Sequence, residues 1–220
     1  MLAMVEDDYY PVECSDQAFF LNAGIVFDAN EVQEHIEEHA VPHSAALLAR
    51  VRETQSPYFT GALARVNASW QNLGQNAKVA AAKAGLRPPE ANPFMNNVAQ
   101  AVEIVDALDR CADLCRKLAE PGAIASSSLP VPFEVKAGRA VGFTEAPRGA
   151  LFHDLTLDAE GRVTHASILT PTAQNVANLE ADMRLLAEKL VADGAAEDVV
   201  RLEIEKLVRA YDPCLSCSVH

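Results

Sequence analysis

The chain has 220 residues, of which 50% are hydrophobic, and its 31 acidic against 18 basic residues give a net charge of −13 at pH 7. It contains no cluster of lysine and arginine suited to a phosphate backbone and no apolar run near the roughly 20 residues that cross a bilayer, so we expect neither a nucleic-acid partner nor a membrane span. The acidic start does not resemble an export signal, and the cysteine count of five is odd, so we expect a cytoplasmic protein with reduced cysteines or metal ligands.

The first part of the chain, residues 1–125, is predicted to be helical. The segment 18–27 (AFFLNAGIVF) fits either a buried strand or a short apolar helix, and periodicity does not decide between them. From Asn30 the pattern favours a helix, which is interrupted at Pro42 and resumes through SAALLARVRE. An alanine-rich helical stretch then runs to Lys83, before a glycine and two prolines that are typical of a helix end.

The helix predicted at residues 92–120 has the clearest pattern in the chain. Asn92 can cap its first turn, and Pro93 suits its first helical position. Its apolar residues recur every three or four positions and predict a stripe that faces the core: Phe94, Val98, Val102, Val105, Leu108, Ala112, Cys115 and Leu118. We expect Cys111 and Cys115 to be small core residues, because free cysteine behaves as a buried hydrophobe.

The composition changes at residues 126–132 (SSSLPVP), and apolar alternation from there to Thr170 predicts a small antiparallel sheet at about 130–170. Two amphipathic helices follow, one from about Ala173 and one from Glu197 to Ala210. The expected fold is α+β and mainly helical, in a single domain, 1–220. Its parts are the helical part (1–125), the sheet (126–170), and the helices with a buried, metal-binding tail (171–220).

The tail, YDPCLSCSVH, contains two cysteines at CxxC spacing, Cys214 and Cys217. Such a pair can share a metal as thiolates or form a redox disulfide. A thioredoxin-like exchange site is disfavoured, because that CxxC opens a helix after a strand and this one follows a helix. Zinc would require four ligands, and the isolated Cys14 does not supply a second CxxC.

Two further segments carry side chains suited to an anionic group. EAPRG (145–149) holds Arg148 between a proline and a glycine, where it can present several donors or form a simple surface salt bridge. TPTAQN (170–175) places Thr172 at a strand-to-helix junction, where its hydroxyl can serve an anion site or cap the helix.

Together and in this order, EAPRGALFH, ILTPTAQN and the final YDPCLSCSVH closely resemble the C-terminal half of the large, catalytic subunit of a [NiFe]-hydrogenase. TGALARVN (60–67) and HS (43–44) are similar to the same family. The ending CLSCSVH and the PTAQN followed by NLE look most like the cytoplasmic, bidirectional enzymes linked to NAD(P) or deazaflavin, and we favour the NAD(P)-linked type.

This resemblance implies a nickel–iron centre with cyanide and carbon monoxide on the iron. Cys214 is the implied terminal nickel ligand, and Cys217 is the implied bridge between nickel and iron, in agreement with the preference of soft thiolates for such metals. The implied reaction is the reversible heterolytic cleavage of H2 to protons and electrons, with Cys214 as a plausible first proton acceptor.

The resemblance also assigns the residues around the metals. Arg148, with Pro147 and Thr172, would surround the cyanide ligands, and Asp212 would orient Arg148. Arg148 and Asp212 therefore join Cys214 as the implied catalytic residues.

The implied second metal is a magnesium ion bound by the His220 imidazole and the backbone carbonyl of Ile168. The implied partners are an Fe-S small subunit, diaphorase-type subunits, and a polypeptide that carries the N-terminal half of the site with its own CxxC. That half is not found in these 220 residues. The chain is then a fragment, a split subunit, or a catalytically inactive structural or assembly subunit derived from a hydrogenase.

Overall fold

The computed structural model describes residues 1–13, 15–121 and 132–219, so Cys14 and His220 lie outside the described residues. Its strands are β1 (Leu2–Met4), β2 (Gln17–Phe20), β3 (Ile25–Asp28), β4 (Ile36–Val41), β5 (Ser44–Val51), β6 (Gly138–Ala146), β7 (Gly149–Leu157) and β8 (Val163–Leu169). Its α-helices are α1 (Val32–His35), α2 (Ala62–Ser69), α3 (Gln75–Lys83), α4 (Asn96–Leu118), α5 (Pro171–Ala192) and α6 (Glu197–Tyr211). Short 3-10 helices are η1 (Ala29–Glu31), η2 (Trp70–Asn72), η3 (Pro93–Met95) and η4 (Leu215–Ser218).

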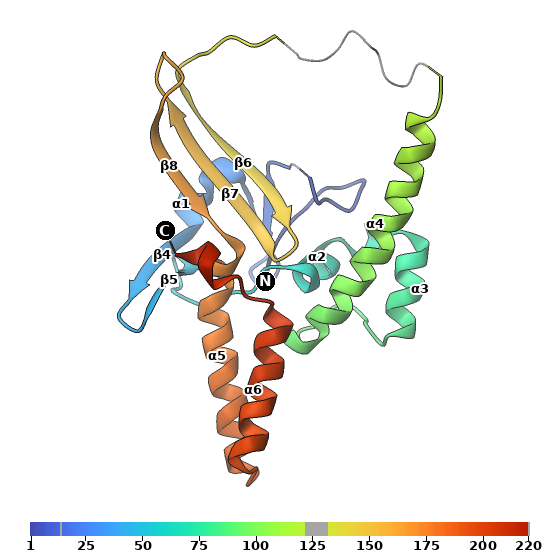
Figure 1. Ribbon diagram of the computed structural model, residues 1–220, viewed down its shortest axis with the longest axis vertical. Coiled ribbons are helices and arrows are strands. Elements are labelled where there is room, and N and C mark those ends of the chain that lie inside the picture. The colour runs from blue at the N-terminus through green and yellow to red at the C-terminus, as the bar shows by residue number, and fades with distance from the viewer. Residues whose placement is uncertain (14, 122–131, 220) are drawn as a thin grey trace.

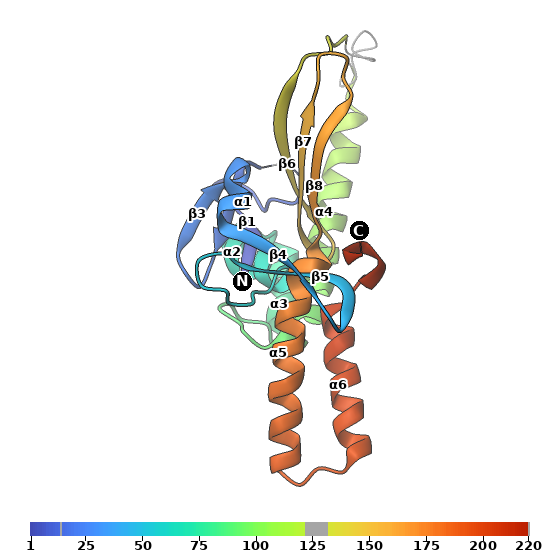
Figure 2. The same ribbon diagram turned by 90° about the vertical axis from the view of Figure 1, so that its left-hand side faces the viewer.

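The described strands form antiparallel sheets in the orders β1-β2-β3, β4-β5 and β6-β7-β8. The long β6–β8 sheet projects from one end of the molecule, and the α5–α6 hairpin projects from the other (Figure 1). A view turned by 90° shows the same two projections pointing in opposite directions (Figure 2). The C-terminal η4 lies between them, where the sheet meets the first turn of α5 (Figure 1).

The core is divided between the helices and the sheets. One buried cluster joins α2, α3 and the first half of α4 to the middle of α5 and the C-terminal end of α6, and it includes Leu63, Val102 and Leu207. The other joins the β1–β3 sheet to β6 and β7, where Phe143 and Phe152 stack with their ring centroids 4.2 Å apart.

The predicted sheet and the three long helices are confirmed. β6, β7 and β8 occupy the predicted sheet region, and α4, α5 and α6 lie within one to four residues of their predicted bounds. Asn92 caps the start of η3, which continues into α4, by accepting a hydrogen bond from the Phe94 N–H. The open segment 18–27 forms strands β2 and β3, joined by a turn in which Gly24 has a φ of 67°.

The helix predicted from Asn30 through SAALLARVRE is wrong, because this region is mainly the β4–β5 hairpin. Alanine, leucine and arginine favour helices locally, so propensity pointed to the wrong structure. The buried residues of β5 are Ala46, Leu48 and Ala49, and Leu48 packs against Val176 and Ala177 of α5. Strand pairing and this contact with α5 outweigh the local preference.

The prediction that the whole apolar stripe of α4 faces the core is also wrong. Val102 in the first half is buried, but Leu108 and Leu118 are 65% and 56% exposed. Cys111 and Cys115, expected in the core, are both exposed. The second half of α4 extends past α3 (Figure 1), so the described part of the chain leaves its apolar face uncovered. Among the described residues, none of the helices has the combined length and apolar composition that a bilayer crossing requires.

Candidate metal centre

The tail begins where α6 ends in a sharp change of backbone direction. Asp212, the residue after Tyr211, has the left-handed angles φ 48° and ψ 55°. Its N–H still donates to the carbonyls of Val208 and Arg209, each at 3.2 Å. Aspartate is one of the few residues other than glycine that adopts this conformation readily. The turn directs Cys214 back toward α5.

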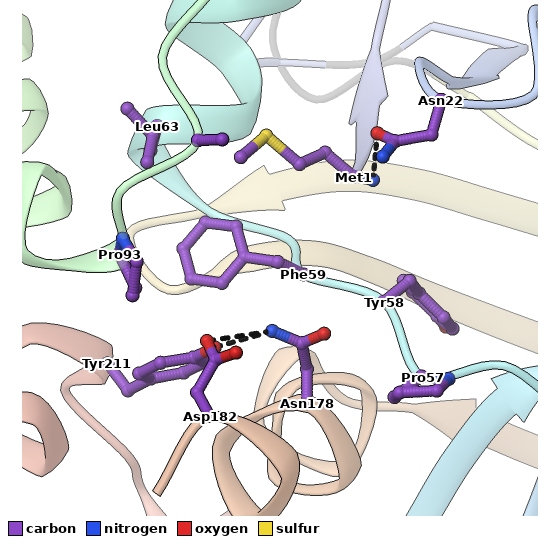
Figure 3. Close-up of a pocket in the computed structure, with 11 residues that line it drawn as sticks. Met1, Asn22, Pro57, Tyr58, Phe59, Leu63, Pro93, Asn178, Asp182 and Tyr211 are labelled. Carbon is purple, nitrogen blue, oxygen red and sulfur yellow. Dashed lines mark hydrogen bonds between the residues drawn. The ribbon is translucent and has the colours of Figure 1, made fainter. Parts of the chain in front are cut away.

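The end of α6 is fixed to α5 by Tyr211. Its hydroxyl donates to the Asp182 carboxylate and accepts from the Asn178 amide, and Figure 3 shows these three side chains together on one wall of a pocket of about 240 Å³. The Tyr211 ring packs edge-on against Phe59, with centroids 5.3 Å apart. Burial, and then the Asp182 carboxylate, raise the pKa of Tyr211 well above its usual range, so the phenol stays protonated.

Cys214 and Cys217 are brought together by the short helix η4. Their Cα atoms are 5.4 Å apart, and the structure joins the two sulfurs as a disulfide, the redox alternative that a CxxC spacing also allows. The Cys217 N–H donates to the Cys214 carbonyl at 2.9 Å, which closes the turn between them. Metal binding requires the reduced, thiolate form of both residues.

The first turn of α5 holds the tail through Thr172. The buried Thr172 hydroxyl accepts a hydrogen bond from the Cys214 N–H at 3.1 Å. Thr170 caps α5 by accepting from the Ala173 N–H, so the capping role considered for Thr172 is wrong. The η4 helix packs against α5 and β5, and Ser218 is buried there.

The tail as a whole lies at the surface of this chain, so the expectation of a buried tail is wrong for the described residues. Cys214 is partly exposed, Cys217 is exposed, and so are Leu215 and Ser216 between them. Nothing in the described part of the chain covers the side of η4 on which these residues lie.

Arg148, from the turn between β6 and β7, reaches the end of α6. Its Nε donates to the Asp212 carbonyl oxygen at 2.6 Å, and its Nη2 donates to Asp212 Oδ1 at 3.0 Å. The guanidinium is therefore held by two bonds to one residue, only two positions before Cys214. The structure brings together Arg148, Asp212, Thr172 and the two cysteines, as the resemblance implies.

The turn that carries Arg148 is packed tightly against the start of α2. Gly149 has a φ of 131°, and a Cβ there would lie 2.5 Å from Cγ2 of Thr60, so only glycine fits. The Thr60 hydroxyl accepts from the Ala150 N–H at 2.9 Å. Asn175 of α5 joins both segments, because its amide donates to the carbonyls of Thr60 at 2.9 Å and of Arg148 at 3.3 Å.

A buried ion network holds the other side of the same turn. Arg65 of α2 is 4% exposed, and its guanidinium donates to the carbonyls of Ala146 at 3.0 Å and Pro147 at 3.3 Å. It also pairs with Glu145 at 2.8 Å and with both carboxylate oxygens of Glu103 at 2.7 Å. Burial raises the pKa of Glu145 above its ordinary value of 4.5, although Arg65 acts in the opposite direction.

A cavity of about 490 Å³ lies between this network and α4. Pro147 and Asp212 line its end near the tail, and Glu103, Ile104 and Ala107 line it along α4. The cavity therefore borders two of the residues near the tail, but neither Cys214 nor Cys217 lines it.

The predicted magnesium site stays a prediction, because one of its two ligands lies outside the described residues. Ile168 lies in β8 opposite His153 and is 40% exposed, whereas His220 is outside the described part. Thr60, Arg65 and Asn175 were not predicted as site residues. An arginine within the apolar run ALARV was the available signal for Arg65, since a charge at such a position must be paired.

The side chains brought together here could supply part of the ligands of a metal site. Cys214 and Cys217 offer two soft thiolates of the kind that bind nickel and iron, next to a rigidly held cation, Arg148. The described residues contain no group of three or more His, Cys, Asp or Glu side chains that could hold a metal alone.

Comparison with known proteins gives a consistent result. The sequence model of the nickel-dependent hydrogenase family matches residues 52–220. Sulfhydrogenase 1 subunit alpha of Pyrococcus furiosus is 39% identical over 204 residues, which cover 90% of this chain and 44% of that protein. NAD-reducing hydrogenase HoxS subunit beta of Cupriavidus necator is 35% identical over 127 residues, which cover 56% of this chain and 25% of that protein.

The fold is also found among solved structures. The crystal structure of an NAD+-reducing [NiFe]-hydrogenase in the H2-reduced state matches with a TM-score of 0.78 and 22% identity, over 100% of this chain and 50% of that chain. This chain therefore spans about half the length, or less, of the proteins that it matches.

Proposed function

The chain belongs to the nickel-dependent hydrogenase family, and we propose that it forms the C-terminal half of the catalytic site of a [NiFe]-hydrogenase, which cleaves H2 reversibly into protons and electrons. The observation that carries this proposal is the convergence of the CxxC pair with Arg148 and Asp212. Segments separated by 64 residues in the chain meet there through two hydrogen bonds from one guanidinium.

Cys214 and Cys217 are the residues that would hold the nickel–iron centre. Their thiolates suit both metals, and CxxC spacing places the two sulfurs close enough to share them. When bound, such a centre supplies a redox-active Lewis acid for heterolytic cleavage of H2. The Cys214 sulfur would be able to accept the first proton, because a thiolate that holds the metals is a base placed beside them.

Arg148 would serve the metal centre as a fixed cation. Its bonds to Asp212 use its Nε–H and one N–H of Nη2, so its other guanidinium N–H groups would be able to donate to the cyanide ligands, beside the Thr172 hydroxyl and Pro147. His220 and the Ile168 carbonyl complete the proposal as ligands of a magnesium ion near the tail.

The partners are proposed from the relatives. Two of the matched proteins are named as subunits, alpha and beta, and one is named as NAD-reducing. An Fe-S small subunit would take the electrons, diaphorase-type subunits would pass them to NAD(P), and a polypeptide with a second CxxC would complete the metal site. The assembly is proposed to work in the cytoplasm.

Metal content tests this function directly. Nickel and iron are measured by elemental analysis in the purified complex, together with intact masses and the rate of H2 oxidation. We expect about one nickel per chain in the wild type and loss of both metals and of H2 oxidation in Cys217→Ser. Cys115→Ser, on α4, is the matched control and should keep its nickel.

A Cys217→Ser complex that retains nickel, iron and activity would contradict the proposal. A wild-type complex without nickel would support the alternative, a structural or assembly subunit derived from a hydrogenase, in which Cys214 and Cys217 have no catalytic role.

A further inference from the structure

The start of α5 carries three buried polar side chains, Thr172, Gln174 and Asn175. Each of them bonds to a segment that is distant in the sequence. Thr172 accepts from the Cys214 N–H at 3.1 Å, and the Gln174 amide donates to the Ala150 carbonyl at 2.6 Å. Because a buried polar group is costly unless it is paired, these bonds hold the distant segments against this end of the helix.

The third side chain, Asn175, holds the residue that carries the guanidinium. Its Oδ1 accepts from the Thr60 N–H at 2.8 Å, and its Nδ2 donates to the carbonyls of Thr60 at 2.9 Å and of Arg148 at 3.3 Å. The two bonds to Thr60 use both ends of the amide, so they fix its orientation and with it the direction of the donation to Arg148. Asn175 is 5% exposed, and water therefore does not compete for these bonds.

The bonds from α5 and the bonds of the guanidinium close a ring. Thr172 holds Cys214, which follows Asp212 by two positions; Asp212 holds the Arg148 guanidinium; and the Arg148 carbonyl returns to Asn175. The guanidinium is thus fixed at its far end by the tail, and its own backbone is fixed by α5. With only one of these two anchors, the long side chain could turn about its remaining bonds.

Both anchors on α5 belong to one helical turn. Thr172 and Asn175 are three positions apart, so they lie on the same side of the helix with their Cβ atoms about 5–6 Å apart. A hydrogen-bonded turn of helix is rigid, and it therefore sets the distance between the Cys214 backbone and the Arg148 backbone.

The turn at 145–149 has further attachments that do not involve Asn175. The Ala150 N–H donates to the Thr60 hydroxyl at 2.9 Å, and the Ala150 carbonyl accepts from Gln174. Arg65 donates to two carbonyls on the other side of the turn. Loss of the Asn175 donor therefore leaves the turn attached and frees chiefly the backbone of Arg148.

Resting on the proposed function, we propose that Asn175 is a positioning residue for Arg148. It holds the Arg148 carbonyl to the same turn of α5 that holds Cys214, and thereby fixes the direction in which the unbonded guanidinium N–H groups face the metal centre. Asn175 itself bonds to neither cysteine, so its effect on the site passes through Arg148.

The reactivity of the guanidinium measures this positioning without any metal. The purified protein is treated with phenylglyoxal, which modifies guanidinium groups, and peptide mass spectrometry compares Arg148 with Arg184, an exposed internal reference. Asn175→Asp keeps the size of the side chain and its acceptor but removes both donations. The Arg148 rate relative to Arg184 should rise about fivefold in this variant, the factor expected from loss of one buried hydrogen bond.

Asn67→Asp is the matched control. Asn67 holds Glu90 as Asn175 holds Thr60, because its amide accepts from the Glu90 N–H at 2.9 Å and donates to the Glu90 carbonyl at 2.7 Å. The control should keep the wild-type Arg148 rate. Circular dichroism checks that both variants fold, and Asn175→Ala, paired with Asn67→Ala, replaces them if Asn175→Asp does not.

Infrared spectroscopy of the purified complex links the positioning to the proposed site. The cyanide stretching bands should shift in Asn175→Asp and stay in place in Asn67→Asp, because only the first change moves a donor to the cyanides. The kcat for H2 oxidation should fall roughly tenfold in Asn175→Asp with the KM for H2 unchanged, since a small displacement of a positioned group slows the reaction step.

Each outcome decides the proposal. An Arg148 rate in Asn175→Asp equal to that in Asn67→Asp would overturn it, because Asp212 alone would then hold the guanidinium. A faster Arg148 reaction with unmoved cyanide bands and unchanged kcat would also contradict it. If the wild-type complex shows neither nickel nor cyanide bands, the proposed function fails, whereas the phenylglyoxal rates still decide whether Asn175 positions Arg148.

Discussion

The two sides of the candidate metal centre are built differently. The turn at 145–149 is held from three directions, by Arg65, Asn175 and Thr60, and every one of these side chains is buried. The tail at 212–218 is mostly exposed, and it is joined to the rest of the chain by the bonds of Arg148 to Asp212 and of Cys214 to Thr172.

This difference separates what the chain fixes by itself from what it leaves to its surroundings. The backbone around Arg148 is held by buried side chains, and its guanidinium is held by Asp212 of the tail. The two sulfurs lie on a surface segment that has few bonds to the rest of the described chain.

We expect the largest loss of stability from a substitution in the buried network that holds the turn at 145–149. Arg65→Met removes the cation between the buried Glu145 and the partly buried Glu103 carboxylates, and should lower the free energy of unfolding by about 3–5 kcal/mol, because uncompensated buried charge is costly. Urea denaturation measures it. Arg184→Met breaks an exposed pair with Glu188 and should leave the midpoint unchanged. Equal midpoints for the two variants would show that the network does not stabilise the turn.

A second variant tests the close packing of the turn. Gly149→Ala combines a φ of 131° with a Cβ 2.5 Å from Thr60, and should destabilise the protein by about 2–5 kcal/mol. Gly24→Ala has a φ of 67° but nothing within 4 Å of the new Cβ, so its expected loss is about 1–2 kcal/mol. Thermal unfolding of both variants, side by side, isolates the contribution of the contact. A similar loss for both would place the turn farther from Thr60.

A substitution that loosens the tail should have a small effect on stability and a larger effect on metal binding. Thr172→Val removes the acceptor of the Cys214 N–H, with an expected loss of only about 1 kcal/mol in unfolding free energy. Nickel retained after dialysis against a chelator should fall several-fold, since the bond orients the segment that holds the metal. Thr172→Ser keeps the hydroxyl and should keep the nickel. Normal nickel retention in Thr172→Val would remove Thr172 from the site.

The smallest expected effect is on the pH dependence of stability. Because burial raises the pKa of Glu145 above 4.5, the folded chain binds more protons there than the unfolded chain as pH rises from 4.5. The contribution of this carboxyl to stability therefore declines with rising pH through that window. Glu145→Gln should lack this decline, which is measured as the difference between its unfolding free energy and that of the wild type from pH 4.5 to 7. Parallel pH profiles would show that Glu145 does not titrate there.

The parts of the fold that were predictable are those in which one pattern dominates. Apolar residues alternate in 138–169 and recur every three or four positions in α5 and α6, because one face of each element is buried. The β4–β5 hairpin was missed because alanine and leucine carry a helical preference, and only contact with α5 reverses it. The stripe of α4 was read correctly as apolar, but an apolar pattern does not tell whether the partner belongs to the same chain.

The site residues also divide into those that a sequence pattern reveals and those that only the fold reveals. Cys214, Cys217 and Arg148 could be selected from the sequence because their residue types and their order match a known family. Arg65 and Asn175 act through backbone carbonyls of a distant turn, and no local pattern reveals such a partner. Thr172 could also be selected from the sequence, but its bond to the Cys214 backbone requires the fold to bring residues 42 positions apart into contact.

The α5–α6 hairpin offers a fixed point for attachment. Its turn contains Gly194, which has a φ of 76° and open space around it, at the end of a 22-residue helix that begins at the metal centre. At about 1.5 Å per residue, the turn lies roughly 33 Å from Thr172 along α5. A peptide tag inserted there would tether the protein to an electrode or a resin by its far end, with the cysteine pair facing the solution.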